Sequence, residues 1–263
     1  MQARSALFDL YGDHLRVRGG RAPVAALVRL LAPVKIAAPA VRTAVSRMVR
    51  QGWLAPARLT GGPGYQLTPK ASRRLDEAAS RIYRTARAAW DGRFDLLIVV
   101  PPADRRARER LADDLTFLGY GRLGDETWVG ARPSAEVDQL LIDAGIPAER
   151  FSASHHRGVP GSMALVRSAW DLAAVGAAYT DFVERMRPVV APVNGRSPDD
   201  QAYAARFVLV HEWRSFLFRD PQLPAALLPD DWPGATAASF FDRHAARLRP
   251  AADRFVATCL EES

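Results

Sequence analysis

The segment that most constrains the fold is residues 40–51, where polar and apolar side chains recur with helical spacing. On a helix each residue is rotated by about 100° from the one before, and we measure the angles from Arg42. An arc of roughly 200 to 340° then holds only apolar side chains: Val41, Ala44, Val45, Met48 and Val49. The opposite arc of roughly 0 to 140° holds only polar ones: Arg42, Thr43, Ser46, Arg47 and Arg50. The segment is therefore expected to be a helix that packs one face on a core and exposes arginines and hydroxyls, ending at Gly52.

Helices and a hairpin are predicted around this segment. Residues 3–17 and a segment from Pro23 to about Leu31 have helical patterns and are separated by Gly19 and Gly20. After Gly52 the pattern predicts a hairpin, followed by a long helix that Thr68 caps and Pro69 begins: strand 53–59, turn 60–64, strand 65–67 and helix 69–89. Three helices followed by a hairpin are typical of a winged helix-turn-helix.

The remaining residues predict a different architecture. Strand and helix patterns alternate in the order of a split ferredoxin-like domain: strand 94–100, helix 104–118, strands 120–123 and 127–131, helix 135–144 and strand 151–154. Further helices are expected near residues 163–187, 199–219 and 236–249, with a proline-rich connection at 220–234. We therefore predict an α+β chain with three parts: a winged helix domain with a linker helix (1–89), a ferredoxin-like middle domain (90–160) and a helical C-terminal domain (161–263).

Charge is divided unequally along the chain. Residues 1–90 contain 16 Lys and Arg against 4 Asp and Glu, whereas residues 91–263 contain 20 against 25. A basic N-terminal part favours a polyanionic partner. A helix of this kind can enter the major groove, where Arg binds guanine edges and Ser or Thr reaches bases or phosphate. The predicted DNA-binding residues are Arg42, Thr43, Ser46, Arg47, Arg50 and, on the hairpin, Arg58. The alternative is an ordinary solvated basic face.

Several other classes of protein are not indicated. The only cysteine is Cys259, so an intrachain disulfide or a Cys-rich metal site is excluded. Gly119, Gly121 and Gly124 match the dinucleotide fingerprint, but a helix precedes them and a strand follows, which is the wrong context. His155, His156 and His211 have no metal-ligand or catalytic spacing. We therefore expect that the protein is not an enzyme and binds no metal or cofactor. We also expect a cytoplasmic protein, because the sequence shows no membrane span or signal peptide.

The predicted C-terminal helices are rich in aromatic and arginine side chains. A pocket with aromatic walls and Arg at its mouth would suit an aromatic or acyl ligand that carries phosphates. The candidate ligand-binding residues are Trp170, Arg185, Arg187, Trp213 and Arg214. The alternative, a helical core without a pocket, stays open.

Short stretches along residues 10–234 resemble the PaaX-like transcriptional regulators, the repressors of phenylacetic acid degradation. They occur in order at 10–13, 18–20, 41–44, 52–54, 82–84, 90–92, 187–188, 220–224, 227–229 and 232–234. The resemblance implies a homodimer that binds palindromic double-stranded operator DNA, with a middle domain similar to the CRISPR-adaptation nucleases. It also implies release by an aryl-acyl-CoA, typically phenylacetyl-CoA. Arg42 and Thr43 lie in a matching stretch and are carried over as DNA contacts, whereas Ser46, Arg47 and Arg50 rest on helical geometry.

The resemblance leaves some points open. The chain ends about thirty residues after Trp232, Pro233 and Gly234, so a ligand contact from a longer tail of relatives is expected to be missing. Nuclease activity is not expected, because Asp95 has no second carboxylate paired with it for metal. The leading hypothesis is a ligand-responsive repressor of aromatic acid catabolism. The alternative is a non-sensing architectural or co-regulatory DNA-binding protein whose C-terminal helices serve only dimerisation.

Overall fold

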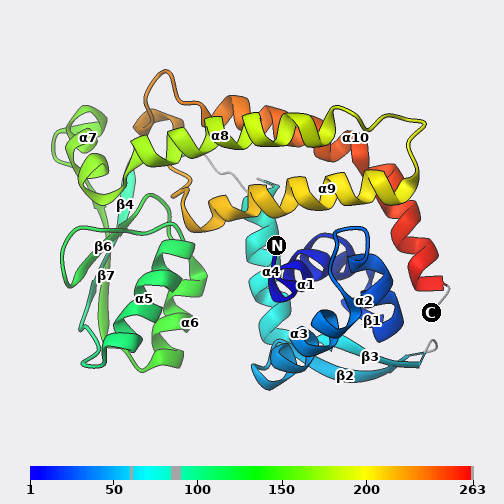
Figure 1. Ribbon diagram of the computed structural model, residues 1–263. Coiled ribbons are helices and arrows are strands. Elements are labelled where there is room, and N and C mark those ends of the chain that lie inside the picture. Colours follow the sequence, from blue (N-terminus) through cyan, green and yellow to red (C-terminus); the bar gives the residue numbers. More distant parts are fainter. Residues whose placement is uncertain (60–61, 84–89, 262–263) are drawn as a thin grey trace. The chain divides into compact units, whose positions relative to one another are not determined.

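The computed structural model describes residues 1–59, 62–83 and 90–261 (Figure 1). Helices and antiparallel sheets form two compact units. Unit 1 contains residues 1–86, 182–214 and 236–263, and unit 2 contains residues 87–181 and 215–235. Within the described part of the chain, every helix is too short or too polar to cross a membrane.

The N-terminal part of unit 1 contains the expected helices and hairpin. Its elements are α1 (Ala3–Leu10), a π-helical turn (Tyr11–Leu15), a 3-10 turn (Arg16–Arg18), β1 (Arg21–Pro23), α2 (Val24–Leu31), α3 (Ala38–Arg50), β2 (Leu54–Leu59), β3 (Gly62–Leu67) and α4 (Pro69–Ile82). Thr68 caps α4 as predicted, since its hydroxyl accepts a hydrogen bond from the Ala71 amide at 3.2 Å. The predicted end of this helix, residues 84–89, lies outside the described residues.

The hairpin belongs to a three-stranded antiparallel sheet in the order β1-β3-β2, of which β1 was not predicted from the sequence. A Cβ atom on Gly64 would lie 2.5 Å from the backbone oxygen of Ala22, so only glycine lets β1 approach β3 here. The predicted turn at 60–64 was too long, because β3 already begins at Gly62, which pairs with Leu59 of β2. Residues 60–61 lie outside the described residues.

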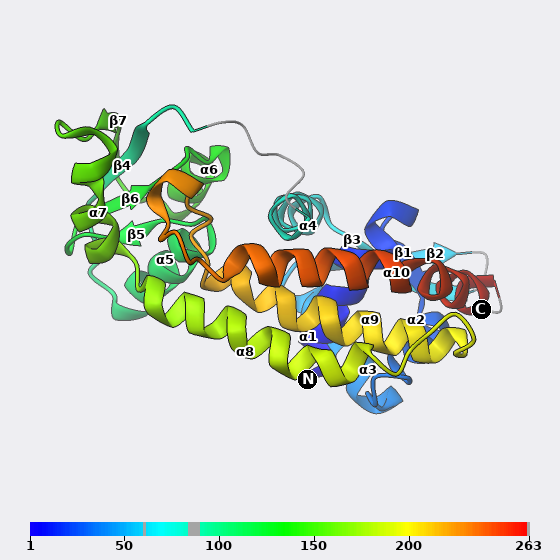
Figure 2. The same ribbon diagram turned by 90° about the horizontal axis from the view of Figure 1, so that it is seen from above.

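Helices from the C-terminal third complete the core of unit 1. They are the end of α8 (Leu172–Val190), α9 (Asp199–Arg214) and most of α10 (Gly234–Glu261). Tyr203 and Phe207 of α9, with Ala252, Val256 and Cys259 of α10, belong to the same buried apolar cluster as the side chains of α1, α2 and α3. Figure 2 shows α9 and α10 side by side along this part of the chain. The basic N-terminal part therefore shares one core with α9 and α10.

Helix α10 continues beyond its predicted end at residue 249. Pro250 lies inside it, although proline removes a backbone donor and usually ends a helix. The three apolar residues that α10 buries after Pro250 offset this loss, because each removes apolar surface from water.

Unit 2 contains a four-stranded antiparallel sheet in the order β5-β6-β4-β7. Its elements are β4 (Arg93–Val99), α5 (Arg105–Phe117), β5 (Gly121–Arg122), β6 (Thr127–Gly130), α6 (Ala135–Ala144), β7 (Ala148–Ser154) and α7 (Gly158–Ala169). In Figure 1, α5 and α6 lie together beside this sheet. Phe94 and Val129 pack with Val166 of α7, and Leu97, on the alternate face of β4, is also fully buried.

The single helix predicted at residues 163–187 was wrong, because α7 and α8 are separate. Trp170 has an extended backbone (φ −138°, ψ 135°) that ends α7. Asp171 then accepts a hydrogen bond from the Ala174 amide at 2.9 Å, as an N-cap residue does. Similarly, the predicted helix 199–219 is α9 followed by a 3-10 turn (Ser215–Phe218).

Candidate nucleic-acid interface

Helix α3 is fixed at both ends and along its buried face. Pro39 lies in its first turn, where a missing amide costs no helical hydrogen bond. At the other end Gly52 adopts a left-handed conformation (φ +71°) while the Trp53 amide donates to the Met48 oxygen at 2.9 Å. This is the arrangement of a Schellman cap. Val41, Ala44, Val45 and Met48 are buried, as the periodicity predicted.

The opposite face of α3 is exposed along its whole length. Arg42, Thr43, Ser46, Arg47 and Arg50 are all exposed. The Thr43 hydroxyl donates to the Pro39 oxygen at 2.9 Å, so in this structure it serves its own helix. Arg42, Arg47 and Arg50 form no hydrogen bond or ion pair with any residue in the ranges 1–59, 62–83 and 90–261. Their guanidinium groups are therefore free to bind an anion.

Strand β2 of the hairpin carries one further exposed cation. Arg58 is exposed on β2 and pairs with Pro63 across the hairpin. The hairpin is attached to the helices by a hydrogen bond from the Tyr11 hydroxyl to the Tyr65 backbone oxygen at 3.0 Å. At its base, the Trp53 ring meets Phe8 edge-to-face, with centroids 5.1 Å apart. Arg58 is thus carried by a strand that the helical core holds in place.

Further exposed cations of this N-terminal part lie outside the predicted set, and Lys35, Lys70 and Arg73 are among them. Lys35 lies in the turn between α2 and α3 with a positive φ of 61°, and Lys70 and Arg73 lie in the first turns of α4. Their position in a turn and at a helix start was visible in the sequence, but they do not fall on the periodic face of α3.

The five predicted ligand-binding residues have separate environments. Trp170 is buried in unit 2, whereas the other four belong to unit 1. Trp213 is buried and stacks on Phe241 at a centroid distance of 4.7 Å, as a core residue would. Arg214 lies 2.7 Å from Asp9, and Arg185 lies 2.7 Å from Glu212. Arg187 is exposed. The structure therefore does not bring these residues together in one compact unit.

A recess of about 330 Å³ lies elsewhere, on the N-terminal part of unit 1. It is polar and shallow, and contains none of the predicted ligand-binding residues. Its lining is Arg16, Gly19, Gly20, Gln66, Leu67, Thr68, Pro69 and Ser72. No aromatic side chain lines it, so it does not match the aromatic-walled pocket that the sequence predicted.

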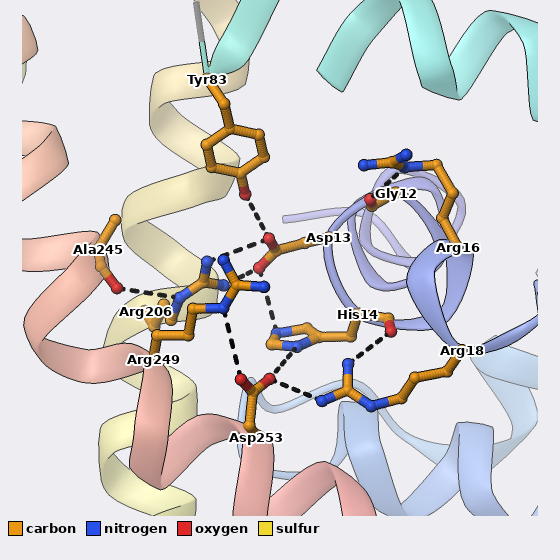
Figure 3. A network of polar contacts seen from close by, with 10 residues as sticks. All are labelled: Gly12, Asp13, His14, Arg16, Arg18, Tyr83, Arg206, Ala245, Arg249 and Asp253. Carbon is orange, nitrogen blue, oxygen red and sulfur yellow. Dashed lines mark hydrogen bonds and ion pairs between the residues drawn. The ribbon is translucent and has the colours of Figure 1, made fainter. Parts of the chain in front are cut away.

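A buried polar network joins the N-terminal part to α9 and α10 (Figure 3). Asp13 accepts hydrogen bonds from the guanidinium group of Arg206 and from the Tyr83 hydroxyl. Burial lowers the pKa of Arg206 to about 10 and raises the pKa of Tyr83 to about 12. Both groups therefore remain protonated near neutral pH and can both donate to Asp13.

Asp253 of α10 forms the second half of the network. Its carboxylate accepts a hydrogen bond from Arg18 at 2.8 Å and lies 3.9 Å from His14. These neighbours, His14 first and Arg18 next, hold the pKa of Asp253 well below its ordinary value. Burial lowers the pKa of His14, although the Asp253 carboxylate opposes this shift. No local pattern in the sequence predicts this network, because its members lie as far as 235 positions apart.

Comparison with known proteins matches the chain along almost its whole length. Family models match residues 2–71 (PaaX-like protein), 87–164 (PaaX protein central Cas2-like domain) and 170–258 (PaaX-like protein C-terminal domain). The transcriptional repressor PaaX of Escherichia coli (strain K12) is 32% identical over 263 residues, covering 96% of this chain and 82% of the relative. The chain belongs to the PaaX-like family.

PaaX-like proteins are regulators rather than enzymes, in agreement with the missing catalytic motifs. Among solved structures, the uncharacterized protein Rv0674 from Mycobacterium tuberculosis matches with a TM-score of 0.58 at 24% identity, covering 97% of this chain and 98% of that one. This likeness concerns the fold alone.

The Cas2-like part of this PaaX-like chain buries one aspartate, Asp95, with its charge neutralised. Arg150 donates to the Asp95 carboxylate at 2.8 and 3.0 Å, and the Tyr120 hydroxyl also donates to it. Asp95 holds the pKa of Arg150 well above its ordinary value, and burial together with the bond to Asp95 raises that of Tyr120. Within the described residues, no three or more His, Cys, Asp or Glu side chains gather where they could hold a metal ion.

Proposed function

We propose that this PaaX-like chain is a transcriptional repressor that binds palindromic operator DNA as a homodimer through α3 and the β2-β3 hairpin. The observation that carries the proposal is the exposed face of α3, with Arg42, Arg47 and Arg50 unpaired within the described residues. Exposed side chains without internal partners can reach base edges, and arginine bound to guanine is the commonest specific contact. The PaaX repressor of Escherichia coli, a relative over nearly the whole chain, supports the same function.

Two architectural assignments support this proposal. The element order α1-β1-α2-α3-β2-β3, with the strands in the sheet order β1-β3-β2, matches a winged helix-turn-helix with α3 as the recognition helix and the hairpin as the wing. The order β5-β6-β4-β7, with one helix after β4 and another after β6, matches a ferredoxin-like middle domain. In this assignment Arg42, Ser46, Arg47 and Arg50 face the major groove, and Arg58 approaches the adjacent backbone or minor groove. The Thr43 hydroxyl could accept a hydrogen bond from a base while it donates to Pro39, but to donate to phosphate it would have to give up that bond.

Regulation is proposed to follow the same family. Operator binding would control phenylacetate or related aromatic acid catabolism, and an aryl-acyl-CoA such as phenylacetyl-CoA would release the repressor. Release requires that the ligand bind more tightly to a dimer geometry in which the two recognition helices no longer match half-sites about one DNA turn apart. Three of the candidate ligand residues, Arg185, Trp213 and Arg214, have partners in unit 1, so a ligand that binds them would have to displace these contacts.

A gel-shift experiment tests the proposal. The probe is the DNA upstream of the chain's own gene, with and without phenylacetyl-CoA and a panel of other acyl-CoAs. Specific binding that one acyl-CoA abolishes is the expected result. Specific binding that no acyl-CoA abolishes would favour the alternative, a non-sensing architectural or co-regulatory protein. No specific binding would overturn both.

A further inference from the structure

The segment of residues 11–18 lies between the proposed wing and the C-terminal helices, and it contacts both. It follows α1 as a π-helical turn (Tyr11–Leu15) and a 3-10 turn (Arg16–Arg18), and it leads directly to β1. Single π-helical turns are rare and occur frequently at functional sites. This segment is therefore an unusual connection within an otherwise regular helical part.

One set of contacts joins the segment to the wing. The Tyr11 hydroxyl donates to the Tyr65 oxygen in β3, as described above. Just after the segment, the Leu67 amide of β3 donates to the Gly20 oxygen at 2.8 Å, and Arg21 of β1 pairs with Gln66 of β3. Because β3 also pairs with β2 along its whole length, the position of Arg58 on β2 depends on where β3 lies.

A second set of contacts joins the same segment to α9 and α10. Asp13 binds Arg206 of α9, and Arg18 and His14 bind Asp253 of α10. Arg18 also donates to the His14 backbone oxygen at 2.8 Å, so Asp253 contacts a segment that is itself braced. Figure 3 shows these side chains converging from the N-terminal part and the two C-terminal helices.

Burial makes these contacts difficult to separate. The side chains of Asp13, His14 and Arg206 are only 7%, 2% and 3% exposed. Moving α9 away from the segment would leave buried charges without partners, which costs far more than breaking an exposed ion pair. A shift of α9 and α10 is therefore expected to move residues 11–18 with it, and through Tyr11 and β1 to move β3.

We propose that residues 11–18 are a coupling segment through which α9 and α10 set the position of the wing, and with it the contact of Arg58 with DNA. The proposal rests on the proposed function, since it specifies how the C-terminal helices act on that DNA-binding site. It assigns a regulatory role to Asp13, Arg18, Arg206 and Asp253, and it assigns the wing, rather than α3, as the element they control.

A double-mutant cycle on the full-length chain tests this coupling, since non-additive effects are the direct measure of interaction between two sites. The affinity for operator DNA is measured at fixed salt for Arg58→Ala, Asp253→Asn and the double variant. Arg47→Ala replaces Arg58→Ala in a parallel cycle for α3. The matched control for Asp253→Asn is Asp199→Asn. Asp199 of α9 pairs at 2.6 Å with Arg254, the neighbour of Asp253 on α10, but makes no contact with residues 11–18.

Each substitution is described by the fold-loss of operator affinity that it causes. The fold-loss caused by Arg58→Ala should be at least about three times smaller in the Asp253→Asn chain than in the unsubstituted chain. Arg47→Ala should cause the same fold-loss in the Asp253→Asn chain and in the unsubstituted chain. In the Asp199→Asn chain, Arg58→Ala and Arg47→Ala should cause the same fold-losses as in the unsubstituted chain. If Asp253→Asn does not fold, Arg18→Gln, which removes the same contact from a side chain 29% exposed, takes its place. Equal factors for Arg58→Ala in all backgrounds would overturn the coupling while leaving the proposed function intact. No operator binding by the unsubstituted chain would overturn both.

Discussion

Arg206 of α9 and Asp13 of the π-helical turn, which are 193 positions apart in the sequence, form a bidentate ion pair with both side chains almost fully buried. The pair lies inside unit 1, where the basic N-terminal part and the C-terminal helices share one core. The part of the chain that carries the proposed DNA-reading face is thus not packed independently of the C-terminal third.

Asp13→Asn should destabilise the chain strongly. The change removes the carboxylate that pairs with the buried Arg206 guanidinium, and breaking a buried pair in this way costs about 3 to 5 kcal/mol. The measurement is the free energy of unfolding in urea. Asp199→Asn, which breaks an exposed pair, should lower the free energy of unfolding far less. Equal losses for the two variants would show that burial of the Asp13 pair is unimportant.

His14 should make stability depend on pH near neutrality. Burial lowers its pKa below the ordinary value of 6.5, so between the two values the unfolded chain binds more protons than the folded one. The free energy of unfolding therefore falls as the pH falls below 6.5.

Comparison of the wild-type chain with His14→Gln isolates this effect above about pH 5, because Asp253, whose pKa His14 lowers, is ionised in both chains there. As the pH falls from about 8 to about 5, the free energy of unfolding should decrease more for the wild-type chain than for His14→Gln. Urea unfolding at several pH values measures it. A difference that is constant across this range would mean that His14 titrates alike in the folded and unfolded chains.

Gly64→Ala should disrupt the contact between β1 and β3. The new methyl group would lie 2.5 Å from the Ala22 oxygen, which is backbone and cannot move aside cheaply, and overpacking of this kind costs roughly 1 to 3 kcal/mol. Gly195→Ala is the control, since nothing lies within 4 Å of its added methyl group. Thermal unfolding of both variants checks the prediction, which fails if Gly64→Ala is as stable as the control.

Local patterns in the sequence were sufficient for the elements near α3. The angular separation of Val41, Ala44, Val45 and Met48 from the arginines correctly predicted the buried face, because a helix fixes the direction of each side chain from its position alone. Gly52 correctly predicted the helix end for the same local reason.

Contacts between distant segments could not be predicted in this way. The pairing of Asp13 with Arg206 cannot be inferred from their positions in the sequence, because it depends on how α9 packs. Strand β1 is three residues long and exists because β3 pairs with it, so it has no pattern of its own. Trp213 and Arg214 carried the chemistry of a ligand site, yet packing places one in the core and the other beside Asp9.

The most direct test of DNA reading by α3 is the operator affinity of Arg47→Ala at fixed salt. Arg47 is exposed and unpaired within the described residues, and the loss of a base contact costs about 1 to 3 kcal/mol of specific binding. Arg243→Ala removes the same charge from an exposed position on α10 and is the matched control. A loss of this size for Arg47→Ala, with little loss for Arg243→Ala, is the predicted result. Unchanged operator affinity for Arg47→Ala, or equal losses for the two variants, would contradict base reading by Arg47 and the orientation of α3 that it implies.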